Sequence, residues 1–191
     1  ALSGFRAVRR RLELVAETGG ITVLSDYAHH PTELAAGVRV ALATPARRRL
    51  ALFQPHRYGR TRAMRGQFPA AFEGMDEVVL LPVYSAWERP EQGGLGANLY
   101  AEFRARSGIK TLYARSHEQA WGYLRTVLAG GGALCVFGAG DVEAVAGWAA
   151  SELAERGAAR LNPAVEWAAG LAGIGLRETR VRTGVPLGPL T

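Results

Sequence analysis

Two short runs combine side chains that commonly bind small polar ligands. Residues 26–33, DYAHHPTE, place a carboxylate, a phenol and two imidazoles just before a predicted helix. Residues 56–62, HRYGRTR, place an imidazole and three guanidinium groups at the start of another predicted helix. Guanidinium groups match carboxylates and phosphates in shape and charge, and helix N-termini attract anions. The second run therefore predicts a site for a small anion, with a solvated loop as the alternative.

The first run has two interpretations. Pro31 and Glu33 are typical of the first turn of a helix, where a missing N–H costs little and a negative charge is favourable. That interpretation leaves Tyr27, His29 and His30 unexplained, which favours contact with a polar ligand. A metal site is disfavoured because neighbouring side chains at a strand end point to opposite sides.

Strands and helices alternate along the chain. Apolar runs predict strands at residues 12–17, 21–25, 49–54, 77–81, 111–113 and 133–137. Helical spacing predicts helices at residues 32–43, 62–73, 95–106, 118–128 and 142–156. Gly19 and Gly20 separate the first two strands and predict an N-terminal hairpin. The order predicts a Rossmann-like α/β fold, a mainly parallel sheet with helices on both faces.

Ligands of such sheets bind beyond the carboxyl ends of the strands. Clusters of polar residues or glycine follow the predicted strands at residues 26–30, 54–60, 83–88 and 138–141, which predicts one site at this edge. The run GAGD at residues 138–141 fits a tight turn as well as ligand contact, because a lone G-x-G is a weak fingerprint. The long loop at residues 82–96, which carries Trp87, is expected to form a rim or lid.

Composition excludes several classes of protein. The chain has 191 residues and a formal charge of +6, and Lys110 is its only lysine. No apolar run is long enough to span a membrane, and the first residues lack the apolar part of a signal peptide, so a cytoplasmic protein is expected. Cys135 is the only cysteine and is expected to be buried. Nucleic-acid binding is not expected, because no basic stripe is interleaved with aromatic residues. No Walker-type phosphate loop is present.

Four motifs together resemble the carboxy-terminal domain of the Mur ligases, and specifically of the member that adds L-alanine to UDP-N-acetylmuramate. They are FRAVRRRLE at residues 5–13, SDYAHHPTE at residues 25–33, FQPHRYGRTR at residues 53–62 and GAGD at residues 138–141. The resemblance implies that residues 1–156 form the third domain of an ATP-dependent, amide-forming ligase of peptidoglycan synthesis. Such an enzyme binds the UDP-sugar and carries its ATP phosphate loop in two other domains, which are its expected partners. This chain alone is therefore expected to be inactive, with the Mg²⁺ ligands outside it.

The resemblance also implies roles for individual residues. Arg11 would reach the ATP phosphates and Asp26 the ribose hydroxyls, as the catalytic pair of this domain, with Tyr27 near the adenosine. The arginines of the second run would grip the carboxylate of L-alanine. The residues implied to line the alanine side are His29, His56, Arg57 and Arg60.

Residues 157–191 are rich in glycine and proline and are expected to form an extension or linker outside the α/β domain, with a helix at residues 163–171. Residues 181–191 resemble the opening of UDP-N-acetylenolpyruvoylglucosamine reductase, which implies a fused ligase–reductase; an ordinary tail is the alternative. For the chain as a whole, the alternative function is a non-catalytic module that binds nucleotides or small anions.

Overall fold

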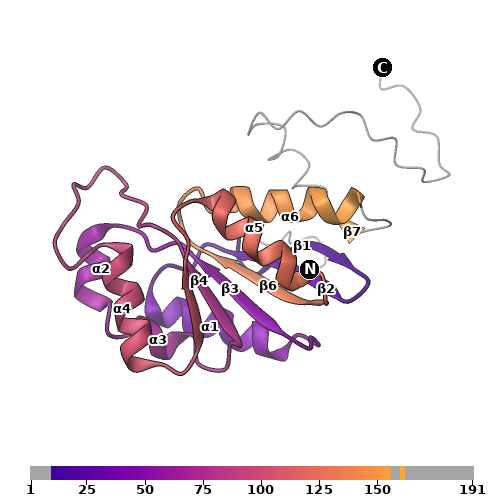
Figure 1. Ribbon diagram of the computed structural model, residues 1–191, viewed down its shortest axis with the longest axis horizontal. Coiled ribbons are helices and arrows are strands. Elements are labelled where there is room, and N and C mark those ends of the chain that lie inside the picture. Colours follow the sequence, from indigo (N-terminus) through magenta and orange to yellow (C-terminus); the bar gives the residue numbers. More distant parts are fainter. Residues whose placement is uncertain (1–9, 156–159, 162–191) are drawn as a thin grey trace, which may run out of the picture.

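A seven-stranded sheet lies at the centre of the structure, a computed structural model that describes residues 10–155 and 160–161 (Figure 1). Five strands are parallel: β2 (Ile21–Asp26), β3 (Arg49–Phe53), β4 (Glu77–Leu80), β5 (Lys110–Tyr113) and β6 (Gly132–Phe137). The antiparallel strands are β1 (Glu13–Thr18), which pairs with β2, and β7 (Arg160–Leu161), which pairs with β1. The order across the sheet is β5-β4-β3-β6-β2-β1-β7.

Helices cover both faces of the sheet (Figure 1). One face carries α5 (His117–Leu128) and α6 (Glu143–Glu155), and the other carries α1 (Pro31–Ala43), α3 (Phe68–Ala71) and α4 (Gly96–Arg106). Successive side chains of a strand point to opposite faces. In β3, Leu52 therefore packs into the core beneath α5 and α6, while its neighbour Phe53 packs into the second core. The apolar central strands thus contribute side chains to the hydrophobic cores on both faces of the sheet.

The predicted α/β class, the mainly parallel sheet and the N-terminal hairpin are confirmed. The single helix predicted at residues 62–73 is wrong, because the chain forms α2 (Tyr58–Met64) and α3 with a turn at residues 65–67. Gly66 weakens a helix at this point, and Pro69 cannot donate the backbone hydrogen bond that a continuous helix would need. The earlier start of α2 places Arg60 on a helix instead of in a loop.

A short strand that follows α6 in the sequence also belongs to the sheet. β7 lies beyond residue 156 and pairs with β1 at the edge of the sheet, so part of the expected extension contributes backbone hydrogen bonds to the α/β domain. The predicted helix at residues 163–171 and the reductase-like residues 181–191 lie outside the described residues. In the part of the chain that the structure describes, no helix has the length and apolar character needed to cross a membrane.

The only cysteine of the sequence is buried, as predicted, and it lies near the centre of the sheet. Cys135 lies on β6 with 1% of its surface exposed. Burial raises the pKa of its thiol to about 12, with a smaller effect from the charge of Asp26. A thiol in this state is a small apolar core residue and takes no part in the chemistry of the site.

Candidate functional site

Polar groups gather where three neighbouring strands end. Asp26 is the last residue of β2, Gln54 follows β3, and Gly138 follows β6. The strand register places these ends level with each other, because Asp26 and Phe53 both pair with Phe137. The carboxyl edge of the sheet therefore brings together clusters that are far apart in the sequence, where open α/β sheets bind their ligands.

Asp26 fastens the hairpin to the site. It is 6% exposed, and its two carboxylate oxygens accept hydrogen bonds from the amides of Ala28 (2.7 Å) and Leu12 (3.1 Å). Burial raises the pKa of Asp26, and these amides and the charge of Arg11 oppose that shift. Since Arg11 and Tyr27 adjoin the bonded residues, Asp26 fixes the backbone from which both side chains project.

Arg10 is built into the turn after β6. Its guanidinium lies over the ring of Tyr27, 4.9 Å from the centroid, and donates through Nη2 to the carbonyl oxygens of Gly138 and Gly140. Its Nε atom lies 3.4 Å from a carboxylate oxygen of Glu143. Arg11, in contrast, is exposed. Of the two adjacent arginines, Arg10 therefore connects Tyr27 to the turn after β6, and Arg11 remains accessible to a ligand.

A row of rings runs along the edge of the sheet. The ring of His29 lies 5.5 Å from that of Tyr27 and 5.2 Å from that of His56, measured between centroids. His56 in turn stacks on Tyr84, with 5.5 Å between centroids and 14° between planes. The row joins the end of β2 to the segments that follow β3 and β4. It brings the predicted residues Tyr27, His29 and His56 into direct contact.

His30 has a structural role at the start of α1. Its Nδ1 atom accepts a hydrogen bond from the amide of Thr32 (3.3 Å), and the carboxylate of Glu33 accepts from the amides of His29 and His30. These reciprocal bonds form a capping box, which satisfies amides that the first turn leaves unpaired. The helix-start interpretation of DYAHHPTE therefore explains His30 in addition to Pro31 and Glu33.

The arginines around α2 differ in their partners. Arg57 Nε lies 2.8 Å from Glu88, Arg62 lies 2.6 Å from Glu91, and Arg65 lies 3.0 Å from Glu102. Arg60 forms no ion pair with any carboxylate in the described ranges. One excess positive charge is therefore left beside the row of rings.

The polar contact of Arg60 defines the state of His56. Arg60 Nη1 lies 3.3 Å from His56 Nδ1, and a guanidinium can only donate, so Nδ1 accepts and the proton resides on Nε2. Burial lowers the pKa of His56, and the nearby His29, Arg60 and Arg57 lower it further. A neutral imidazole beside an unpaired guanidinium suits a site for a carboxylate.

Residues 82–95 form a fixed rim of this site. The amide of Tyr84 donates to the carbonyl of Pro55, and the amide of Arg57 donates to the carbonyl of Tyr84, both at 2.8 Å. The carboxylate of Glu88 contacts Arg57 Nε and also accepts from the amide of Gly59 (3.1 Å). The carboxylate of Glu88 thus provides a negative charge at the first turn of α2. Trp87, next to Glu88, is fully exposed.

The turn GAGD is shaped by packing. A Cβ atom on Gly140 would lie 2.5 Å from both the ring of Tyr84 and Oε1 of Gln54. Gln54 is 4% exposed, and its amide group bonds the carboxylate of Asp141 (2.6 Å) and the amide of Val142 (3.2 Å). These contacts support the tight-turn interpretation of the motif, since the glycines accommodate protein atoms.

Two further features bear on ligands. The described ranges contain no group of three or more His, Cys, Asp or Glu side chains that could hold a metal ion.

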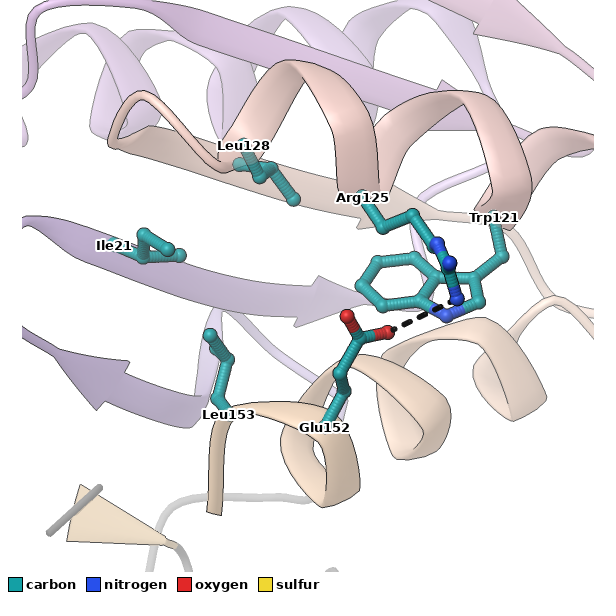
Figure 2. Close-up of a pocket in the computed structure, with 6 residues that line it drawn as sticks. All are labelled: Ile21, Trp121, Arg125, Leu128, Glu152 and Leu153. Atoms are coloured by element: carbon teal, nitrogen blue, oxygen red, sulfur yellow. Dashed lines mark ion pairs between the residues drawn. The ribbon is translucent and has the colours of Figure 1, made fainter. Parts of the chain in front are cut away.

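A small pocket between α5 and α6 is crossed by the ion pair of Arg125 with Glu152 (3.9 Å) and is otherwise lined by apolar side chains (Figure 2). None of the predicted site residues lines it. The carboxyl edge of the sheet is therefore the site that the fold and the side chains indicate together.

The fold and this edge define an α/β domain with arginine, histidine and tyrosine side chains gathered above a parallel sheet. Residues 10–140 match the family model described as Mur ligase, glutamate ligase domain, and the chain belongs to this family. The UDP-N-acetylmuramate–L-alanine ligase of Desulfosudis oleivorans is 42% identical over 143 residues, which are 74% of this chain and 31% of that protein. The enzyme of the same name from Methylococcus capsulatus is 40% identical over 161 residues, 82% of this chain and 33% of that protein.

Solved structures show the same fold. UDP-N-acetylmuramate-alanine ligase from Thermotoga maritima matches with a TM-score of 0.62 at 23% identity, over 82% of this chain and 32% of that one. A domain of a Mur-type ligase from Haemophilus ducreyi matches with a TM-score of 0.53 at 20% identity, over 75% of this chain and 99% of that one. The chain spans about a third of the length of the curated relatives that it matches.

Site residues missing from the sequence prediction are Arg10, Gln54, Tyr84 and Glu88. Gln54, Tyr84 and Glu88 belong to clusters that follow predicted strands, so their position was a usable signal. Arg10 lies in a run of three arginines in which nothing local distinguishes one from another. Its partners are 128 and 130 residues away in sequence, and only the folded chain reveals them.

Proposed function

We propose that this chain is the domain that binds L-alanine, and part of ATP, in an enzyme that joins L-alanine to UDP-N-acetylmuramate. In this account, amino-terminal and central domains bind the UDP-sugar and the ATP phosphates, and this domain completes the site. The observation that carries the proposal is Arg60. It is a guanidinium without an acidic partner in the described part of the chain, beside a neutral His56. Since the substrates are a nucleotide and a UDP-linked sugar, we expect the enzyme to work in the cytoplasm.

On the amino-acid side, Arg60 and Arg57 would hold the carboxylate of L-alanine. A guanidinium binds a carboxylate through charge-assisted hydrogen bonds, which are about twice as strong as neutral ones. Arg57 is exposed and uses only Nε in its contact with Glu88, so its Nη atoms are accessible. His29 and His56 would form the wall against which the rest of the small substrate packs. This arrangement would orient the amine for attack on an activated carboxyl group.

On the nucleotide side, Arg11 would meet the phosphates and Tyr27 would lie near the adenosine. Arg11 is exposed, and Tyr27 is 39% exposed with Arg10 over its ring, so both fit contact with a nucleotide. Asp26 fits a ribose less directly, because both of its oxygens already accept amide hydrogen bonds and only their remaining lone pairs are available. We therefore assign Asp26 the additional task of fixing Arg11 and Tyr27.

ATP supplies the phosphoryl group that activates the muramoyl carboxylate, and Mg²⁺, expected on ligands outside this chain, neutralises its phosphates. The contribution of this domain is orientation and charge stabilisation. Arg11 would stabilise phosphate charge, while Arg57 and Arg60 would fix the carboxylate end of the amino acid. No residue of this domain needs to form a covalent intermediate in this account.

Arginine substitutions in the complete ligase test the assignment. Losing a hydrogen bond to a charged group costs about 1.5–3 kcal/mol, so Arg60→Ala should raise the apparent KM for L-alanine by roughly ten- to a hundredfold. Arg57→Ala should also raise the apparent KM for L-alanine. The KM for ATP should stay close to that of the wild type.

Arg62→Ala is the matched control. Arg62 is an arginine of the same helix whose charge is already paired with Glu91, and its substitution should leave the kinetics of L-alanine unchanged. Unchanged alanine kinetics in both Arg57→Ala and Arg60→Ala would remove the two arginines from the carboxylate site.

A further inference from the structure

Glu88 connects the rim to the amino-acid side of the site. One oxygen of its carboxylate accepts from Arg57 Nε at 2.8 Å, and the other accepts from the amide of Gly59 at 3.1 Å. The two acceptors therefore hold both the side chain of Arg57 and the first turn of α2. These contacts lower the pKa of Glu88, chiefly through the amide of Gly59 and then through Arg57, so the carboxylate is charged at neutral pH.

The backbone around this contact is strained. Among the described residues, the non-glycine residues with positive φ are Arg10, Leu12, Arg57, Ala86 and Trp87. All five lie at the carboxyl edge, and three of them adjoin the contact between Arg57 and Glu88. Strained backbone of this kind persists where surrounding contacts enforce it, and it clusters at functional sites.

The turn that delivers Glu88 is an example. The amide of Glu88 donates to the carbonyl of Ser85 at 3.0 Å, which closes a four-residue turn. Its central residues, Ala86 and Trp87, have φ of 45° and 73°, the signs that a type I′ turn requires and that glycine or asparagine normally provides. Ala and Trp at these positions oppose the turn, so the contacts of the following Glu88 help to maintain it.

The form of the contact leaves Arg57 able to bind a ligand. Glu88 occupies the Nε edge of the guanidinium, and neither Nη atom of Arg57 donates a hydrogen bond to any residue in the described ranges. A guanidinium presents five N–H donors in a rigid plane. Fixing that plane at Nε therefore orients the outer Nη edge without consuming it.

We propose that Glu88 is a positioning residue of the amino-acid site: it holds Arg57 in the orientation in which its Nη edge receives the substrate carboxylate. This inference rests on the proposed function. It differs from a simple attachment of the rim, because the rim has other attachments. Arg62 pairs with Glu91 at 2.6 Å, and Arg65 donates to the carbonyl of Gly93 at 3.2 Å.

Steady-state kinetics of Glu88→Gln in the complete ligase test the inference. Glutamine keeps the size of the side chain but loses the charge. It has one acceptor oxygen, so it cannot accept from both Arg57 Nε and the amide of Gly59, as the two carboxylate oxygens do. The apparent KM for L-alanine should rise about three- to tenfold, as expected for weakening one charge-assisted hydrogen bond. The kcat and the KM for ATP should remain within about twofold of wild type, since a carboxylate anchor bound equally in ground and transition states affects KM.

Glu91→Gln is the matched control, since it removes the neighbouring ion pair of the same loop with the same helix. It should leave the KM for L-alanine unchanged. A double-mutant cycle supplies the decisive comparison, because Glu88→Gln should add nothing to the KM in an Arg57→Ala background. Equal effects of Glu88→Gln with and without Arg57, or equal effects of Glu88→Gln and Glu91→Gln, would overturn the inference and leave Glu88 a structural residue.

A spectroscopic measurement on the 191-residue chain separates this inference from the proposed function. The ¹H–¹⁵N resonance of Arg57 Nε, assigned by its loss in Arg57→Ala, should exchange slowly with water in the wild type and rapidly in Glu88→Gln. An identical Arg57 Nε resonance in the two chains would refute the positioning contact. A wild-type ligase that makes no alanine-dependent product would instead contradict the proposed function, whatever the resonance shows.

Discussion

The state of His56 follows from its neighbours on three segments of the chain. Burial is the main cause of the lowered pKa of His56. His29 after β2, Arg60 on α2 and Arg57 before α2 lower it further, and Glu88 opposes the shift. The lowered pKa means that the folded protein binds a proton on His56 at lower pH than the unfolded chain does. As pH falls below the unfolded pKa of about 6.5, the unfolded state is favoured progressively.

Thermal unfolding of the chain at two pH values tests this account of His56. The melting temperature of the wild type should fall between pH 7.5 and pH 5.5, because protonation of His56 in the unfolded state lowers the free energy of unfolding. His56→Gln removes the titrating group and should show a smaller fall over the same interval. A fall in the variant as large as in the wild type would show that His56 is not perturbed in this direction.

At the scale of elements, the residue patterns predict what depends on local geometry. Buried β3 and β6 follow from continuous apolar runs, and the start of α1 follows from Pro31 with a capping carboxylate. Patterns of this kind could not predict the pairing of Glu88 with Arg57, which are 31 residues apart, because the pairing depends on how the loop after β4 packs on α2. The sequence does not predict the break between α2 and α3, because the helical spacing of Met64, Phe68 and Phe72 continues across it.

The turn after β6 is the element whose packing can be tested most simply. A methyl group on Gly140 would meet the ring of Tyr84 and the side chain of Gln54 at 2.5 Å. Overpacking of this kind costs about 1–3 kcal/mol, so Gly140→Ala should lower the free energy of unfolding by that amount in urea denaturation.

Gly122→Ala is the control for this turn. Gly122 lies within α5 with nothing within 4 Å of a Cβ atom, so alanine should stabilise the helix by up to about 1 kcal/mol. Equal stability of Gly140→Ala and the wild type would mean that the turn has space for a ligand, which would revive the ligand-contact interpretation of GAGD.

At the scale of the whole molecule, the excess of arginine is not a uniform positive surface. Around α2, the carboxylates of Glu88, Glu91 and Glu102 pair with three arginines and leave Arg60 without an acidic partner among the described residues. The net charge of +6 is therefore a weaker indication of binding partners than the position of the Arg60 guanidinium. The chain also spans about a third of its curated relatives, and its sequence contains no phosphate loop.

The most direct measurement is product formation from ATP, L-alanine and UDP-N-acetylmuramate, with this chain alone and with the complete ligase that includes the amino-terminal and central domains. The account predicts ATP- and alanine-dependent formation of UDP-N-acetylmuramoyl-L-alanine by the complete protein and none by the 191-residue chain. Turnover by the chain alone would contradict it. So would a complete protein that makes no alanine-dependent product while the isolated chain binds ATP tightly, a result that would indicate a non-catalytic nucleotide-binding module.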